Sequence, residues 1–110
     1  MRLPTHIAVS GLIRQVQAEG GFATVLARGE RDAGTLVLIL TNRGSLSIAY
    51  EIAPQADGTR GWSQAKAETA DDSGAFGEYL QRRRHQDPDL WIVELDVENP
   101  ERFIAGQIES

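Results

Sequence analysis

The stretch Asp87-Pro88-Asp89-Leu90-Trp91-Ile92-Val93-Glu94 joins a basic, helix-like segment to a strongly apolar, strand-like one. Proline fixes its own φ and disfavours the helical region for the residue before it, so a helix is expected to end at Asp87. The apolar residues that follow predict a strand over residues 90–97, which Asn99-Pro100 ends. The junction therefore predicts a helix over residues 75–85 that leads directly into a core strand.

Four further strands are predicted upstream, over residues 22–28, 35–41, 46–52 and 62–67. The run from Leu36 to Leu40 is apolar without a break, which is typical of a central strand covered on both faces. Residues 46–52 alternate between apolar and polar side chains and predict one buried face. Asn42-Arg43-Gly44 is a tight hairpin turn, so this middle part of the sheet is predicted to be antiparallel.

A first helix is predicted before these strands, because apolar residues recur there at helical spacing. They are Val9, Leu12, Ile13 and Val16. Thr5 is a candidate N-cap, with Ser10 as the alternative start, and Gly20-Gly21 supplies the stop. Gly11 weakens a helix interior, so its presence predicts close packing against a neighbouring backbone.

The order of elements is α-β-β-β-β-α-β, and it fits a single domain over residues 1–110. Short hairpin links place the chain in the α+β class. The expected architecture is a mainly antiparallel sheet of four to five strands with two helices packed on one face. Phe103, Ile104 and Ile108 form a short amphipathic end that is expected to dock on the core.

The amino-acid composition limits the cellular compartment in which the protein is expected and the kinds of binding site that it can contain. The chain has no cysteine, which excludes disulfides and thiolate zinc sites. The N-terminal residues lack the apolar core of a signal peptide, and the longest apolar run is too short to span a bilayer. We therefore expect a cytoplasmic protein that does not bind a membrane, and no motif predicts a cofactor.

Charge is unevenly distributed along the chain. After Trp62 there are five basic and eleven acidic residues, and the net charge of the whole chain is −5. Binding to nucleic acid requires clustered Lys and Arg that neutralise phosphates. The acidic second half therefore argues against a nucleic-acid partner.

The one basic cluster, Arg82-Arg83-Arg84-His85, lies at the end of the predicted second helix. Cations there are stabilised by the helix dipole, and this structural interpretation is favoured. The alternative is an anion or partner site, since arginine recognises carboxylate and phosphate. Asp87 and Asp89 are likewise favoured as the helix stop. Alternatively, they bind Mg²⁺ or perform general acid–base work, with Glu94 or Asp96 as a third oxygen ligand of the metal.

The two tryptophans have different expected roles. Trp91 begins a buried-looking strand and is predicted to be core. Trp62 follows a loop, so it is a candidate anchor for a protein partner. Neither histidine lies in a metal-binding spacing, and no nucleophile elbow, phosphate loop or dinucleotide fingerprint is present. The candidate site residues are Arg82, Arg83, Arg84, Asp87, Asp89, Glu94 and Trp62.

With these motifs the chain resembles a small family of uncharacterised bacterial proteins, domain of unknown function 1491 (DUF1491), seen mostly in alphaproteobacteria. The matching features span nearly the whole chain. They are a first helix ending in Gly20-Gly21, the strand from Phe22 to Gly29, Ala33-Gly34 before an apolar strand, Trp62 after a loop, and Asp87-Pro88-Asp89-Leu90-Trp91 leading into Ile92-Val93-Glu94. The resemblance implies a compact bacterial domain. It implies no activity, cofactor or catalytic residue.

The favoured function is a non-enzymatic binding or interaction domain that self-associates as a homodimer. The reason is the central strand, whose apolar side chains point to both faces of a sheet that has helices on one face alone. A second copy is then expected to cover the other face. The alternative is an enzyme, or a binder of small anions or metal ions, that uses the region from Arg82 to Asp89.

Overall fold

The computed structural model describes residues 3–107, and Ile108 lies outside this range. Within it the chain forms three helices and five strands in the predicted α+β order, with a third, short helix at the end. The elements are α1 (Thr5–Ala18), β1 (Phe22–Ala27), β2 (Leu36–Thr41), β3 (Ile48–Pro54), β4 (Arg60–Ala67), α2 (Ser73–Gln86), β5 (Trp91–Asp96) and α3 (Pro100–Ala105). None of the described helices is long and apolar enough to cross a membrane.

The five strands form one sheet in the order β1-β5-β2-β3-β4. β5 runs antiparallel to β1 and parallel to β2, while β2, β3 and β4 follow one another through antiparallel hairpins. The sheet is therefore mixed, although its remaining pairs are antiparallel as expected. The parallel pair is possible because β5 follows β4 only after α2, a connection long enough to carry the chain back to the end of the sheet where β2 begins.

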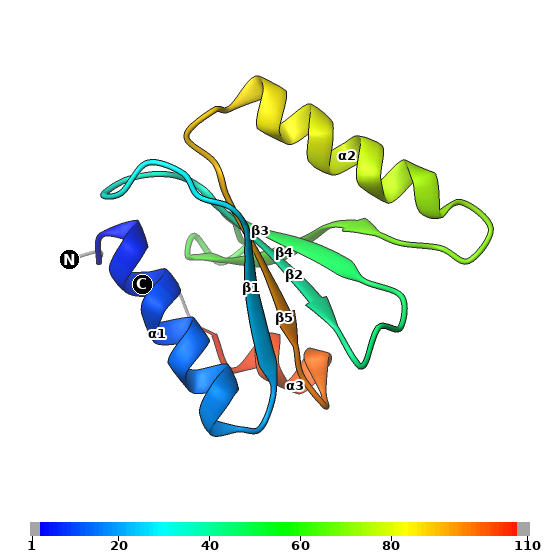
Figure 1. Ribbon diagram of the computed structural model, residues 1–110. Coiled ribbons are helices and arrows are strands. Elements are labelled where there is room, and N and C mark those ends of the chain that lie inside the picture. Colours follow the sequence, from blue (N-terminus) through cyan, green and yellow to red (C-terminus); the bar gives the residue numbers. More distant parts are fainter. Residues whose placement is uncertain (1–2, 108–110) are drawn as a thin grey trace.

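The helices lie on opposite faces of the sheet, as Figure 1 shows for α1 and α2. The expectation that both pack on one face is therefore wrong. On one face, α1 and α3 bury Leu38 and Leu40 of β2 together with Val93 of β5. On the other face, α2 buries Val37 and Ile39 through Phe76 and Tyr79. The unbroken apolar run of β2 thus has a helix layer above and below it.

This two-sided cover bears on the expected homodimer. Val37, Leu38, Ile39 and Leu40 are each at most 1% exposed within the single chain. The sheet face that a second copy was expected to cover is already covered by α2. Any self-association must therefore use another surface.

The two long helices agree with some of the predicted local signals and differ from others. The Asp72 carboxylate accepts a hydrogen bond from Ala75 N–H at the start of α2, and α2 ends at Asp87 before the proline as predicted. Thr5 does not cap α1: it is the first helical residue, and its hydroxyl donates to the Gly34 carbonyl at 2.8 Å. Gly11 is exposed and has no neighbour within 4 Å of where a Cβ would lie, so the close packing predicted there is absent.

Candidate functional site

A hollow of about 480 Å³ lies where the C-terminal end of α2 meets the end of β1. The hollow is lined by both charged and apolar side chains. The lining residues are Ala27, Arg28, Gln81, Arg84, His85, Asp87, Pro88 and Leu90. Two of the predicted site residues, Arg84 and Asp87, meet here.

The two halves of the wall are held together by β1, β5 and the segment that follows β1. Ala27 pairs with Ile92, so the end of β1 lies beside the beginning of β5. Just beyond, Glu30 N–H donates to the Asp89 carbonyl at 3.0 Å, and the Trp91 indole N–H donates to the Glu30 carbonyl at 2.7 Å. The loop after β1 is thus fixed to the strand that follows α2.

Arg28 is positioned by the same contacts. Its guanidinium carbon lies 5.4 Å from the centroid of the Trp91 ring, a cation–π arrangement that limits the positions the side chain adopts. Arg84 reaches the hollow from the last turn of α2. Among the residues that the structure describes, neither arginine forms an ion pair, because the single described salt bridge joins Arg83 and Glu51.

The charges around the hollow favour an anion. Arg28 and Arg84 contribute two guanidinium groups, and His85 adds an imidazole. Asp87 is the one carboxylate in the described wall, and its Oδ1 atom already accepts a hydrogen bond from Asp89 N–H at 3.0 Å. The donors of the two arginines match the geometry of a carboxylate or phosphate.

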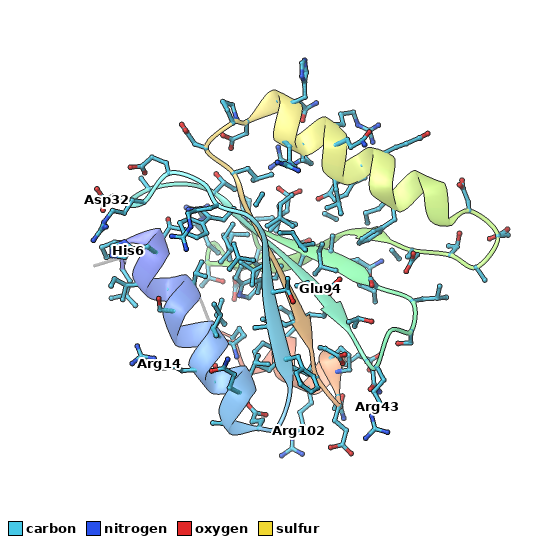
Figure 2. The ribbon with its side chains drawn as sticks, viewed as in Figure 1. His6, Arg14, Asp32, Arg43, Glu94 and Arg102 are labelled. Carbon is cyan, nitrogen blue, oxygen red and sulfur yellow. The ribbon has the colours of Figure 1, made fainter. Side chains whose placement is uncertain are left out.

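The other predicted candidates lie elsewhere. Arg82 and Asp89 are exposed and outside the described wall of the hollow. Glu94 is half-buried over the middle of the sheet (Figure 2). Trp62 is also half-buried, and it packs against the core on the α1 face. His85 belongs to the basic cluster for which an anion site was the alternative prediction. The sequence did not point to Arg28 or Gln81, and Arg28 follows β1, far from α2 in the sequence.

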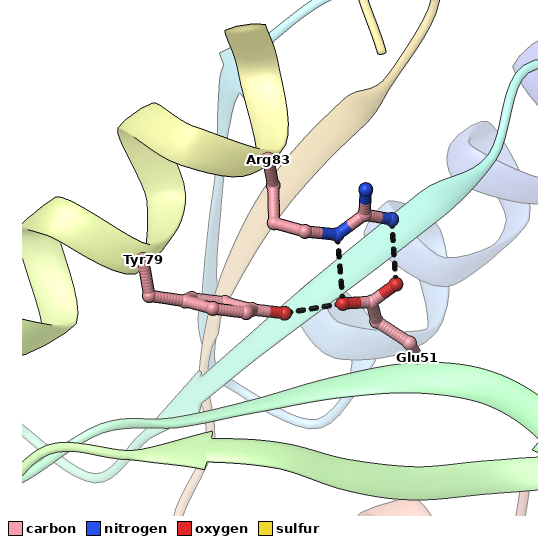
Figure 3. A network of polar contacts seen from close by, with 3 residues as sticks. All are labelled: Glu51, Tyr79 and Arg83. Carbon is pink, nitrogen blue, oxygen red and sulfur yellow. Dashed lines mark hydrogen bonds and ion pairs between the residues drawn. The ribbon is translucent and has the colours of Figure 1, made fainter. Parts of the chain in front are cut away.

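Arg83 has a structural partner and is not available to a ligand. Figure 3 shows its guanidinium bound to Glu51 of β3, with Nε to Oε2 at 3.0 Å and Nη2 to Oε1 at 2.7 Å. The Tyr79 hydroxyl donates to the same Oε2 atom. Burial alone raises the pKa of Glu51, but the hydrogen bonds from Arg83 and Tyr79 outweigh it and hold this pKa below its ordinary value of 4.5. This network ties α2 to the sheet.

Replacing Glu51 with Gln is expected to lower the free energy of unfolding at neutral pH by about 1–2 kcal/mol, because a half-buried ion pair and a charged hydrogen bond are lost. The pKa of Glu51 is lowered on folding, so the contribution is complete above about pH 4.5 and declines as the pH falls through the folded-state pKa. Urea denaturation at neutral and acidic pH measures this. A difference between the two proteins that grows on acidification would contradict it.

The acidic candidates do not converge on a metal site. Asp87 lines the hollow, Asp89 lies outside it, and Glu94 lies on the sheet. Across residues 3–107, no group of three or more His, Asp or Glu side chains is arranged to hold a metal ion. The described geometry therefore offers cationic groups for an anion and no converging carboxylates for a cation.

Comparisons with known proteins agree with the fold. The family model described as "Protein of unknown function (DUF1491)" matches residues 3–105. A crystal structure of a DUF1491 family protein from Caulobacter crescentus CB15 is 31% identical, covers 98% of this chain and 100% of its own, and superposes with a TM-score of 0.78. The NMR structure of a DUF1491 family protein from the same organism is 32% identical, with 100% and 99% coverage and a TM-score of 0.77.

A third similar structure is the solution structure of protein Atu0922 from A. tumefaciens. It is 29% identical, covers 100% of this chain and 98% of its own, and has a TM-score of 0.70. No curated protein matches the chain.

Proposed function

This chain belongs to the DUF1491 family, and we propose that it is a non-enzymatic binding domain that holds an oxyanion group in the hollow between α2 and β1. The observation that carries the proposal is the meeting of Arg28 and Arg84 around one hollow. Their ligand is a carboxylate or phosphate group, which guanidinium binds through paired hydrogen bonds. We place this function in the cytoplasm, in keeping with the absence of cysteine.

The shape of the hollow favours binding one group of a larger molecule. Its volume of about 480 Å³ falls within the usual range of ligand sites, but most of its lining side chains are exposed. An open site of this kind excludes little water, whereas catalysis gains from a closed and dry one. The described lining also contains no hydroxyl or thiol nucleophile. These features support binding rather than chemistry.

The net charge of the chain further restricts the class of anion that it can bind. The chain has a net charge of −5, so a long polyanion is repelled by most of the surface. A single oxyanion meets only the local field of Arg28 and Arg84. We therefore propose one phosphate or carboxylate group, carried by a small molecule or by a partner protein, and not a nucleic acid.

Inorganic phosphate is the simplest probe of this site. Titration followed by ¹⁵N–¹H NMR is expected to shift the side-chain signals of Arg28 and Arg84 and the backbone signals of Gln81 and His85. Arg28→Gln or Arg84→Gln should each weaken binding by about tenfold to a hundredfold, because a charge-assisted hydrogen bond contributes about 1.5–3 kcal/mol.

Arg82→Gln is the matched control for this experiment. Arg82 is exposed on the same helix, two positions before Arg84, and lies outside the hollow. It should bind phosphate as the unaltered chain does. If all three variants weaken binding equally, the anion is held by the general charge of the helix and the proposed site is wrong. Citrate, titrated in the same way, separates a preference for carboxylate from one for phosphate.

A further inference from the structure

Asp87 places a fixed carboxylate in the wall of the hollow between α2 and β1. Its backbone N–H donates to the Arg83 carbonyl at 3.0 Å, and its backbone carbonyl accepts from Leu90 N–H at 3.1 Å. The side chain is held as well, because its Oδ1 atom accepts from Asp89 N–H at 3.0 Å. Pro88 further restricts the backbone of the residue before it. The carboxylate therefore has little freedom to turn away when an anion enters the hollow.

The second carboxylate oxygen of Asp87, Oδ2, has unused capacity to accept hydrogen bonds. Within residues 3–107 it accepts none, and the described ion pair of α2 joins Arg83 to Glu51 instead. Asp87 is half-buried, and no described side-chain oxygen of such a residue is both buried and without a hydrogen-bond partner. The Oδ2 atom is thus open to solvent, where a ligand can donate to it.

An ionised carboxylate accepts hydrogen bonds and donates none, which limits the anions that can lie beside it. A fully deprotonated oxyanion also has acceptors alone, so it meets Asp87 with like charge and without a hydrogen bond. An oxyanion that carries an O–H group donates to the carboxylate, while its other oxygens accept from Arg28 and Arg84. A carboxylate beside two guanidinium groups therefore discriminates between anions of equal size and charge.

We infer that Asp87 makes the hollow selective for an oxyanion that carries its own hydrogen-bond donor, such as hydrogen phosphate or a hydroxycarboxylate. This inference rests on the proposed oxyanion site and adds the chemical class of its ligand. The donor is a hydroxyl rather than an ammonium group, because Arg28 and Arg84 repel a further cation. Sulfate and acetate carry no such donor, so the site disfavours them.

Phosphate and sulfate are the first matched pair of probes. In mildly alkaline buffer both are mainly tetrahedral dianions, but only phosphate keeps a proton. Titration of the full chain followed by ¹⁵N–¹H NMR is expected to show about tenfold tighter binding of phosphate, because a hydrogen bond to an ionised group replaces a like-charge contact. Glycolate and acetate are the second pair, in which glycolate adds one hydroxyl beside the carboxylate. A preference within the first pair identifies hydrogen phosphate, and one within the second identifies a hydroxycarboxylate.

Asp87→Asn tests the role of the carboxylate. The asparagine amide oxygen still accepts from Asp89 N–H, so the end of α2 and the melting temperature should be kept. The amide N–H group donates where the carboxylate oxygen accepted. Sulfate should then bind about tenfold more tightly, while the affinity for phosphate changes little. The preference for phosphate over sulfate is therefore expected to disappear, and the preference for glycolate over acetate with it.

Asp89→Asn is the matched control, because it removes the same charge from an exposed residue outside the described wall. It should strengthen the binding of sulfate and phosphate equally and keep the preference. If the two anions of each pair bind the unaltered chain equally, the inference is overturned although the oxyanion site stands. The same holds if Asp87→Asn changes both affinities by one factor. If none of these anions binds, the oxyanion site itself is wrong and its selectivity falls with it.

Discussion

Replacing Trp91 with Ala is expected to lower the free energy of unfolding by about 3–5 kcal/mol, the range measured for truncating a large buried aromatic residue. The Trp91 side chain is 2% exposed and belongs to the core between the sheet and α1. Its indole N–H also satisfies the Glu30 carbonyl at 2.7 Å. The substitution therefore opens a cavity and removes a hydrogen bond that fixes the loop after β1.

Urea denaturation followed by circular dichroism measures this loss, and two variants divide it into parts. Trp91→Phe keeps most of the apolar volume but leaves the Glu30 carbonyl without its donor, so it should cost about 1–3 kcal/mol. Trp62→Ala is the control for removing an indole, and it should cost less than Trp91→Ala because Trp62 is only half-buried. Equal losses at the two tryptophans would contradict the central role given to Trp91.

Trp91 also connects stability to the proposed site. Its ring lies against the Arg28 guanidinium, and its indole N–H holds the loop that follows β1. The smaller aromatic ring of the Trp91→Phe variant would preserve part of the cation–π contact, whereas alanine preserves none. Phosphate binding is therefore expected to survive Trp91→Phe better than Trp91→Ala at temperatures where both variants remain folded.

The order of the main elements could be predicted because each depends on nearby residues. Pro88 stops α2, and the spacing of apolar residues defines α1. Arg43 and Gly44 both adopt positive φ, at 54° and 75°, as the tight turn between β2 and β3 requires. Such signals act over a few residues and need no knowledge of the tertiary fold.

The placement of the helices depends on contacts between distant segments, which local sequence patterns do not predict. The unbroken apolar run of β2 correctly indicated cover on both faces, and Leu90 to Val93 is a second such run. Two central strands of this kind, β2 and β5, lie side by side in the sheet. The second face was assigned to another copy, although the chain already contained α2 to cover it.

Only part of the candidate site could be predicted, because the rest of it also depends on contacts between distant segments. Arg84 and Asp87 stood out because they flank the end of a helix. Arg28 lines the same hollow only because β1 pairs with β5, and no local sequence pattern predicts that pairing. Arg83 is the opposite case: its place in a basic run made it a candidate for ligand binding as the alternative to a structural role, and its actual partner, Glu51, comes from the distant strand β3.

Replacing Gly29 with Ala is expected to lower the free energy of unfolding by about 3 kcal/mol, because the new methyl group has no space. A Cβ at this position would overlap the Asp89 carbonyl oxygen and would lie 2.6 Å from the backbone carbon of Leu90. Both obstacles are backbone atoms at the entry to β5, so no side-chain rotation relieves the clash. The loop after β1 must move away from β5, and the Glu30 N–H to Asp89 hydrogen bond is weakened with it.

Gly11→Ala is the matched control, since it makes the same chemical change in open space. Gly11 lies inside α1, is exposed, and has nothing within 4 Å of an added Cβ. Alanine there should raise the free energy of unfolding by about 0.5–1 kcal/mol, because it favours the helix and restricts the unfolded chain. The two variants are thus expected to shift the urea midpoint in opposite directions. A Gly29→Ala chain as stable as the parent would mean that the end of β1 does not pack on the backbone before β5. The proposed position of Arg28 beside the end of α2 would then be wrong.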